Sequence, residues 1–438
     1  MSTDSMPLQD LPCLSLQGSM LCQRTIKRRS RCGASEGLDA ECTPTELIQL
    51  CSPKHKLQRL CSRDKENECG AFVLARRSRR KKESSSGISW DHLPDELLLK
   101  MLLFLPLQEL LRMSTVCKRW HRLVFDESLW HSVDLEGLTH GGAALQQVLT
   151  TGVRRLRCPR SFVEDLVFTA SGCVQQTETL GPGSLLVQHL IPLQIVQLDL
   201  SSSVIPTSAL ESIVCRCRML EYLSLEGLQL SDAIISSLAV NVNLLQLNLS
   251  GCSGFSAAAL ADMLSSCCRM EQLNVSWCEF TGDHVKSVVR NLSSSVTQLN
   301  LSGYRESLSL DDVKVLVGRC PQIQTLDLSD STLLMADSFP VLAQLKRLLH
   351  LSLSRCYHIH LAALTDLGKT FPLLGLLDVF GLVLDGHLPS LKKELPRVSI
   401  NSRPFSSVAR PTPSSRLPGA LSERTMWSSL CRLRFRPQ

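Results

Sequence analysis

The phrase LQLNLSGC occupies residues 245–252, and its recurrence through the second half of the chain decides the fold. Further copies are VQLDLSSS at 196–203, EYLSLEGL at 221–228, EQLNVSWC at 271–278, TQLNLSGY at 297–304, QTLDLSDS at 324–331, LHLSLSRC at 349–356 and GLLDVFGL at 375–382. The first leucine of each L-x-L or L-x-V core recurs every 24 to 27 residues. These leucines are Leu198, Leu223, Leu247, Leu273, Leu299, Leu326, Leu351 and Leu377.

This period is the spacing of leucine-rich repeats. Each repeat is expected to form a short parallel strand, a turn and a helix, for example a helix over Ala257–Ser266. A single repeat cannot bury its apolar face, whereas stacked neighbours bury a continuous core. The spacing therefore predicts an α/β solenoid, a horseshoe, over 132–401 with about eight clear repeats. Weaker strands that extend it to ten or eleven are expected at Val133-Asp134-Leu135, Leu156-Arg157-Cys158 and Val398-Ser399-Ile400.

One interval breaks the period, because Leu156 and Leu198 are 42 residues apart. That distance is too long for one repeat and short for two. Residues 171–194 contain Gly-Pro-Gly, a combination typical of loops. We therefore expect a loop inserted at 171–194.

Many of the 19 cysteines follow the repeat. An odd cysteine count without a secretory signal favours reduced thiols over a disulfide scaffold. Zinc is the alternative, but the chain has no two CxxC pairs at zinc-finger spacing. We expect small buried thiols and neither a metal nor a cofactor. Three cysteines lie five residues after a repeat leucine and three lie six before one: Cys252, Cys278 and Cys356, then Cys217, Cys267 and Cys320.

Residues 88–131, here called the docking segment, precede the repeats and include SWDHLPDELLLKMLLFLPLQELLRMSTVCKRWHRLVFDESLW. We expect one helix that has Pro94 in its first turn and ends at Pro106, a second over Gln108–Val116 and a third over Lys118–Val124. Three short helices cannot bury this many leucines among themselves, which indicates a partner surface. The alternative is a small helical core that caps the solenoid.

LPDELL, LPLQELL, VCKRW and the following LW together resemble an F-box. The resemblance implies docking onto the Skp adaptor, S-phase kinase-associated protein 1, and through it onto the cullin and RING subunits of an SCF (Skp–cullin–F-box) ubiquitin ligase. Such docking is a helix-in-groove contact with a few apolar anchors. The resemblance places the adaptor contacts, or the core behind them, at Leu93, Pro94, Leu97, Leu98, Leu107, Leu110, Leu111, Val116, Cys117 and Trp120.

An F-box followed by leucine-rich repeats resembles a family of substrate receptors for these ligases. Over 88–438, with SLEGLQLSD, LNLSGCSGFS and ARPT among the matching phrases, the chain is similar to a cell-cycle branch of the family. This branch recruits phosphorylated Kip-family CDK inhibitors with a Cks accessory protein, and its tail, here 402–438, folds back on the repeats. Cyclin–CDK is a further implied partner. The receptor itself is not an enzyme.

The same resemblance assigns the accessory and substrate surface to Trp277, Arg305, Asp330, Arg355, Tyr357 and Phe405. All but Phe405 follow a strand by a few residues, so successive repeats are expected to line them along one rim. Mixed charge and aromatic groups are typical of binding hot spots. The alternative for each is a solvated rim position, and for Phe405 it is docking onto the repeats of its own chain. Where the family has histidine before this phenylalanine, the chain has Pro404.

The ends of the chain are basic. Residues 1–89 hold 16 Lys and Arg against 10 Asp and Glu, whereas residues 90–401 hold 24 against 30. Low periodicity predicts a mostly disordered regulatory arm over 1–87. It contains a basic cluster expected to act in nuclear import, with a solvated linker as the alternative. The cluster comprises Arg76, Arg77, Arg79, Arg80, Lys81 and Lys82.

We expect a soluble protein of nucleus and cytoplasm, without membrane or nucleic-acid partners, since the chain shows neither a long apolar segment nor a basic groove. No P-loop, GxSxG or other catalytic set is present in the sequence. Two other functions stay open. One is a leucine-rich-repeat scaffold or inhibitor outside any ligase. The other is a nuclear protein that binds nucleic acid through its basic ends, with an affinity that falls steeply with salt.

Overall fold

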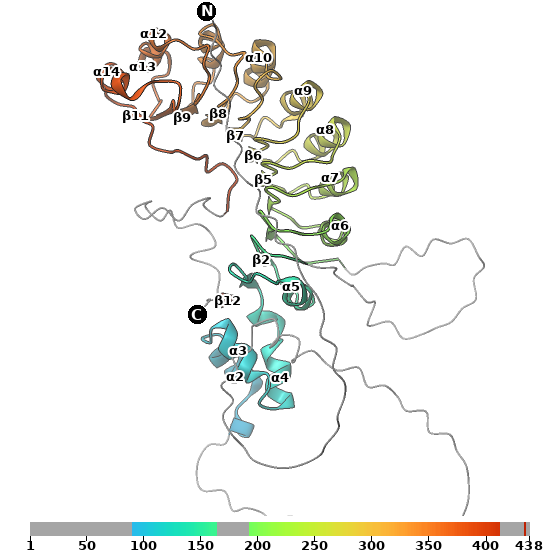
Figure 1. Ribbon diagram of the computed structural model, residues 1–438. Coiled ribbons are helices and arrows are strands. Elements are labelled where there is room, and N and C mark those ends of the chain that lie inside the picture. Colours follow the sequence, from blue (N-terminus) through green and yellow to red (C-terminus); the bar gives the residue numbers. More distant parts are fainter. Residues whose placement is uncertain (1–89, 164–191, 412–432, 435–438) are drawn as a thin grey trace, which may run out of the picture. The chain divides into compact units, whose positions relative to one another are not determined.

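Residues 90–163, 192–411 and 433–434 are described by a computed structural model (Figure 1). The predicted arm at 1–87, the import cluster at 76–82 and most of the predicted loop at 171–194 lie outside these residues. At the end of that loop range, Leu193 is buried and bridges to Cys217. Leu193 therefore packs with the repeats.

Within the described residues, twelve short strands form one parallel sheet. The strands β1 to β11 follow one another in chain order, and β12 pairs with the free edge of β1. The predicted solenoid, including its three weaker strands, is confirmed. The strands are β1 (Ser132–Asp134), β2 (Arg155–Arg157), β3 (Gln197–Asp199), β4 (Tyr222–Ser224), β5 (Gln246–Asn248), β6 (Gln272–Asn274), β7 (Gln298–Asn300), β8 (Thr325–Asp327), β9 (His350–Ser352), β10 (Leu376–Asp378), β11 (Ser399–Ile400) and β12 (Leu433–Arg434).

The repeat leucine is the central residue of strands β3 to β10 and pairs with its counterpart in the neighbouring strand, as Leu247 does with Leu273. All eight of these leucines are almost completely buried. Side chains alternate between the two faces of a strand, so the residues on either side of the leucine face away from this core. They form parallel polar columns on the concave face.

Side-chain hydrogen bonds follow several strands at the point where the strand ends. The Asn274 side-chain oxygen accepts a hydrogen bond from the Ser276 amide at 3.1 Å, and the Asp327 carboxylate accepts one from the Ser329 amide at 3.0 Å. Asp199, Asn248 and Asn300 make the same contact in their repeats. Such a contact turns the backbone two residues on, which takes the chain out of the sheet.

Helices cover the other face of the sheet, and Figure 1 shows α6 to α10 in succession beside strands β3 to β8. Ser231, Ser256 and Ser309 cap α7, α8 and α10 by accepting from a first-turn amide. Helix α8 has the predicted bounds. The helices are α5 (Gly142–Leu149), α6 (Thr207–Val214), α7 (Asp232–Leu238), α8 (Ala257–Ser266), α9 (Gly282–Asn291), α10 (Leu310–Arg319), α11 (Ser338–Leu342), α12 (Leu361–Leu364), α13 (Leu367–Thr370), η3 (Asp385–His387) and α14 (Leu388–Glu394).

The docking segment contains η1 (Trp90–His92), α2 (Asp95–Leu102), α3 (Leu107–Met113), α4 (Lys118–Val124) and η2 (Glu127–Leu129). Two predicted ends were wrong. Helix α2 starts after Pro94 and stops before Pro106, because the Phe104 and Leu105 amides bond three residues back and tighten the chain into a turn. Helix α3 stops three residues before Val116 for the same reason. No helix of the described ranges is long and apolar enough to cross a bilayer.

The repeat cysteines are buried, as the pattern predicts. The Cys252 thiol donates to the Leu225 carbonyl oxygen at 3.0 Å, and the Cys278 thiol donates to the Leu249 carbonyl oxygen at 3.0 Å. Burial raises the pKa of Cys278 to about 11 and the pKa of Cys217 and Cys356 to about 12. These side chains stay neutral thiols in the folded protein.

We expect native-state alkylation at about pH 8 to modify the exposed Cys117 and Cys268 and to spare Cys217, Cys252 and Cys356 until urea unfolds the chain. Peptide mass spectrometry measures this. Since unfolded thiols ionise near pH 9 and the folded ones only near pH 11 or 12, the free energy of unfolding falls as the pH rises through about 9 to 11. Rapid labelling of Cys252 in the folded protein would contradict the burial of this thiol at its repeat position.

Candidate functional site

The backbone is left-handed four positions after the repeat leucine in ten successive repeats. Five repeats have glycine there, at Gly137, Gly227, Gly251, Gly303 and Gly381. The other five have side chains at φ between 55° and 61°, at Arg160, Ser202, Trp277, Asp330 and Arg355. A left-handed residue with a side chain is less stable than a right-handed one by about 1–2 kcal/mol. Three predicted binding residues therefore occupy places where glycine is the relaxed choice, and such strain points to a functional role.

Glycine neighbours make room for two of these side chains. The Trp277 ring lies against Gly303, where an added Cβ would meet the ring atom Cδ2 at 2.8 Å. The aliphatic part of Arg355 lies against Gly381, where an added Cβ would be 3.1 Å from Cγ. On this strand-exit rim of the solenoid, Trp277 and Arg355 are thus each followed by a glycine in the next repeat.

The buried carboxylate of Asp330 lies beside both rim arginines and orients one of them. Arg355 Nε donates to Asp330 Oδ2 at 2.8 Å, and its guanidinium carbon lies 5.8 Å from the centre of the Trp277 ring. The hydrogen bond with Asp330, whose side chain is only 1% exposed, raises the pKa of Arg355. Arg305 approaches the other Asp330 oxygen at 3.9 Å, and its side chain stays 66% exposed. The structure thus brings Trp277, Arg305, Asp330 and Arg355 together.

The other two predicted residues are exposed aromatics. Tyr357 lies two positions beyond Arg355, on the same rim, and is 59% exposed. Phe405 belongs to the tail and is 57% exposed. It lines a cavity together with Trp277 and Arg355, so the tail brings it to the rim cluster.

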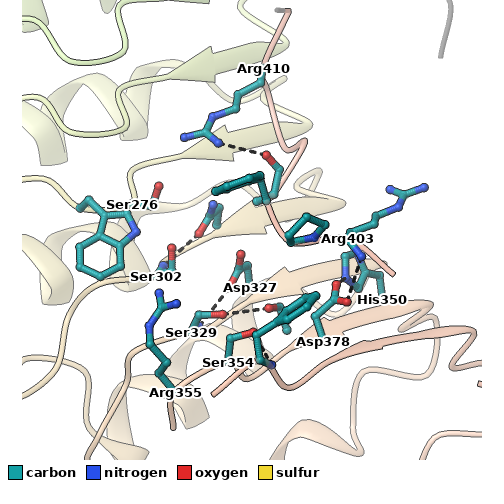
Figure 2. A pocket seen from close by; sticks show the side chains of 17 residues that line it. Ser276, Ser302, Asp327, Ser329, His350, Ser354, Arg355, Asp378, Arg403 and Arg410 are labelled. Atoms are coloured by element: carbon teal, nitrogen blue, oxygen red, sulfur yellow. Dashed lines mark hydrogen bonds and ion pairs between the residues drawn. The ribbon is translucent and has the colours of Figure 1, made fainter. Parts of the chain in front are cut away.

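This cavity, about 190 Å³ in volume, lies between strands β7 to β10 and the tail (Figure 2). Its polar wall includes Asp327, whose pKa is raised by burial, and a His350–Asp378 pair with 2.7 Å between the ring nitrogen Nε2 and Oδ2. Sequence analysis missed these residues and Arg403 and Arg410 of the tail. Alternation along the strands was the available signal, because Asp327, His350 and Asp378 flank repeat leucines.

The described part of the tail, residues 402–411, crosses the concave face from β10 towards β4. The Arg403 amide donates to the Asp378 carboxylate at 3.2 Å. Further on, Val408 and Ala409 are buried against β6, and Arg410 Nε donates to the Glu226 carboxylate at 3.0 Å. Segments more than a hundred residues apart thus form one surface.

The predicted adaptor residues divide into two groups. Pro94, Leu97, Val116 and Cys117 are exposed, and Leu93 and Trp120 are half-buried. The rest form the core behind them: Leu98, Leu107, Leu110 and Leu111.

Three further exposed apolar side chains are not among the predicted adaptor residues: Trp90, Met101 and Phe104. Leu97, Met101 and Phe104 recur at helical spacing on the exposed side of α2 and its following turn, whereas Leu98 and Leu102 face the core.

An apolar groove of about 200 Å³ runs between α2 and α4, lined in part by Trp90, Met101 and Trp120. Arg119 Nε donates to Asp95 Oδ1 at 2.8 Å, and this hydrogen bond lowers the pKa of Asp95. Arg122 also pairs with Asp95, so two ion pairs tie α4 to the start of α2. The exposed apolar side of these helices is thereby held in one geometry.

Among the described residues, no three His, Cys, Asp or Glu side chains are grouped as metal ligands. The repeat thiols are buried and neutral, which makes them poor nucleophiles.

Comparisons with known proteins divide the chain at the same place. A family model described as "SKP2 LRR domain" matches residues 143–434, which is more than half of the chain, and one described as "F-box-like" matches residues 90–136. The chain belongs to the family of F-box proteins with an SKP2-type leucine-rich-repeat domain.

Single relatives match smaller parts. F-box/LRR-repeat protein 12 from Homo sapiens and from Mus musculus are each 51% identical over 43 residues, which are 10% of this chain and only 13% of the relative. The solved leucine-rich repeat-containing protein LegL7 from Legionella pneumophila aligns at 20% identity with a TM-score of 0.31, covering 44% of this chain and 66% of that one. Membership of the F-box family thus rests on the two family models.

The strain on the rim is testable by comparing Trp277→Gly with Trp277→Ala. Both variants remove the ring, and they differ only in a Cβ at a left-handed position. We expect the glycine variant to be more stable by about 1 kcal/mol in urea unfolding. The control variants are Val204→Gly and Val204→Ala, because Val204 is exposed and has an ordinary φ. There the alanine variant should be the more stable of the two. The same order of stability at both positions would contradict backbone strain at Trp277.

Proposed function

We propose that this chain is the substrate-recognition subunit of an SCF ubiquitin ligase. The docking segment binds the Skp adaptor, which links it to the cullin and RING subunits, and the rim of the solenoid with the tail binds the substrate. One observation carries the proposal: an F-box-like segment with an unpartnered apolar side precedes repeats whose strained, charged rim is built at a cost in stability.

The proposed mechanism is proximity. A subunit with docking and substrate surfaces on one chain holds a substrate lysine near the charged conjugating enzyme at high effective concentration. Chemistry then belongs to the partners, and the chain itself is a non-catalytic receptor.

At a finer level we propose a receptor like S-phase kinase-associated protein 2, which takes phosphorylated Kip-family CDK inhibitors together with a Cks accessory protein. The rim offers suitable groups. Arg305 is largely exposed, with only a 3.9 Å contact to Asp330, and is the cation best placed for an incoming anion. Trp277 and Tyr357 of the same rim and Phe405 of the tail present half-exposed rings, as the anchors of a hot spot do. In the resembling family the accessory protein supplies most phosphate contacts.

The proposal also covers the location of the protein and one further partner. The basic cluster at 76–82 directs the protein to the nucleus, with a further pool in the cytoplasm. Cyclin–CDK is a further proposed partner.

The adaptor assignment is tested with Leu97→Asp and Phe104→Asp, at side chains 42% and 87% exposed. Their exposure lets the fold survive, while a charge on the apolar contact should weaken binding to the purified Skp adaptor at least 30-fold, as expected for a hot spot worth about 2 kcal/mol. Calorimetric titration measures the affinity.

Leu384→Asp is the matched control, because Leu384 is also exposed and apolar but lies in the last part of the solenoid. It should bind the adaptor like the wild type. Full binding by both docking variants would reject the adaptor contact and favour a leucine-rich-repeat scaffold outside any ligase.

A further inference from the structure

Two columns of side-chain amides run across the middle of the concave face. Gln246, Gln272 and Gln298 pair in register on neighbouring strands, two residues before Asn248, Asn274 and Asn300. Each of the strands β5, β6 and β7 therefore presents the same glutamine and asparagine on the same face.

On β6 this pair holds a single peptide group of the tail. The Asn274 side-chain amide donates to the Val408 carbonyl oxygen at 3.1 Å, and the Gln272 side-chain oxygen accepts from the Ala409 amide at 3.2 Å. That carbonyl and that amide belong to one peptide bond. The pair thus binds the main chain of the tail, which crosses the strands here, and does not recognise a tail side chain.

The pair on β5 is engaged within the repeats, because the Asn248 side-chain amide donates to the Ser224 hydroxyl and to the Glu226 carboxylate. The pair on β7 differs. The Asn300 side-chain oxygen accepts from the Ser302 amide at 3.0 Å, which turns the side-chain nitrogen the other way. That nitrogen forms no hydrogen bond within the described ranges. It borders the cavity beneath the tail.

A side-chain amide that borders a cavity can donate to a partner that enters the cavity. The tail cannot supply one by continuing its β6 contact. Neighbouring strands are about 4.8 Å apart, while peptide groups of the same orientation in an extended chain recur about every 6.6 Å. When a peptide group of the tail is bound by the β6 pair, no equivalent peptide group of the tail therefore lies opposite the β7 pair.

We infer that Gln298 and Asn300 form a second peptide clasp, which binds one main-chain peptide group of an extended segment of the recruited substrate. The Asn300 side-chain amide donates to the carbonyl of this group, and the Gln298 side-chain oxygen accepts its amide. The segment reaches the cavity beside Trp277 and Phe405. This inference rests on the proposed function and adds a sequence-independent contact to it.

The test uses the full chain with adaptor, Cks accessory protein and a phosphothreonine peptide of a Kip-family inhibitor. Asn300→Asp keeps the oxygen that accepts from Ser302 and replaces the donor with an acceptor. Aspartate stands at the same register in Asp199, Asp327 and Asp378, so the fold should persist. We expect peptide affinity to fall about tenfold, the loss of one hydrogen bond and its replacement by repulsion.

An ester scan of the peptide locates the clasped group. Replacing one amide by an ester should weaken wild-type binding about 3- to 10-fold at a single position and have no effect there in Gln298→Thr, a residue type that Thr325 shows to fit this register. Gln246→Thr is the control and should retain both the affinity and the ester effect.

Two results are distinguishable. A complex that forms but ignores both Asn300→Asp and every ester overturns the clasp and leaves the proposed function standing. A wild-type chain that binds no phosphopeptide contradicts the proposed function and the clasp with it.

Discussion

Each repeat has an apolar face that only the next repeat can cover, and the rest of the structure depends on this constraint. It stacks Leu247 on Leu273 and so on through β3 to β10, which leaves no freedom of register. Every residue at a given distance from the leucine then joins a column of equivalent residues. The amide columns, the strand-ending aspartates and asparagines and the left-handed exit residues are all consequences of one stacking contact.

This regularity makes departures from it informative. A left-handed residue at the exit is needed in each repeat, and glycine supplies it without strain in five of them. Trp277, Asp330 and Arg355 supply it at a loss of stability, and Arg355 contacts both of the others. A rim selected only for folding has no reason for this arrangement. A binding surface has one, because the rigid backbone presents these side chains in fixed positions.

Much of this fold could be predicted from the sequence because its interactions are periodic. Leucine spacing located the strands, and the distance from each leucine located the buried thiols and the exit rim. Contacts without a period could not be predicted. The tail is held largely through main-chain groups of Arg403, Val408 and Ala409, which leave no mark in the sequence. In the docking segment, the sequence does not distinguish Leu97 from Leu98. Only the packing of the three helices shows that Leu97 is exposed and Leu98 is buried.

Reconstituted ubiquitylation tests whether one chain couples a docking segment to a substrate-binding rim. Purified chain is combined with Skp adaptor, cullin, RING subunit, conjugating enzyme, Cks accessory protein and a phosphorylated Kip-family inhibitor. We expect ubiquitin transfer to the phosphorylated inhibitor, loss of transfer after phosphatase treatment and no transfer without the chain. Transfer that is unchanged when the chain is omitted, or no transfer with every component present, would contradict this coupling.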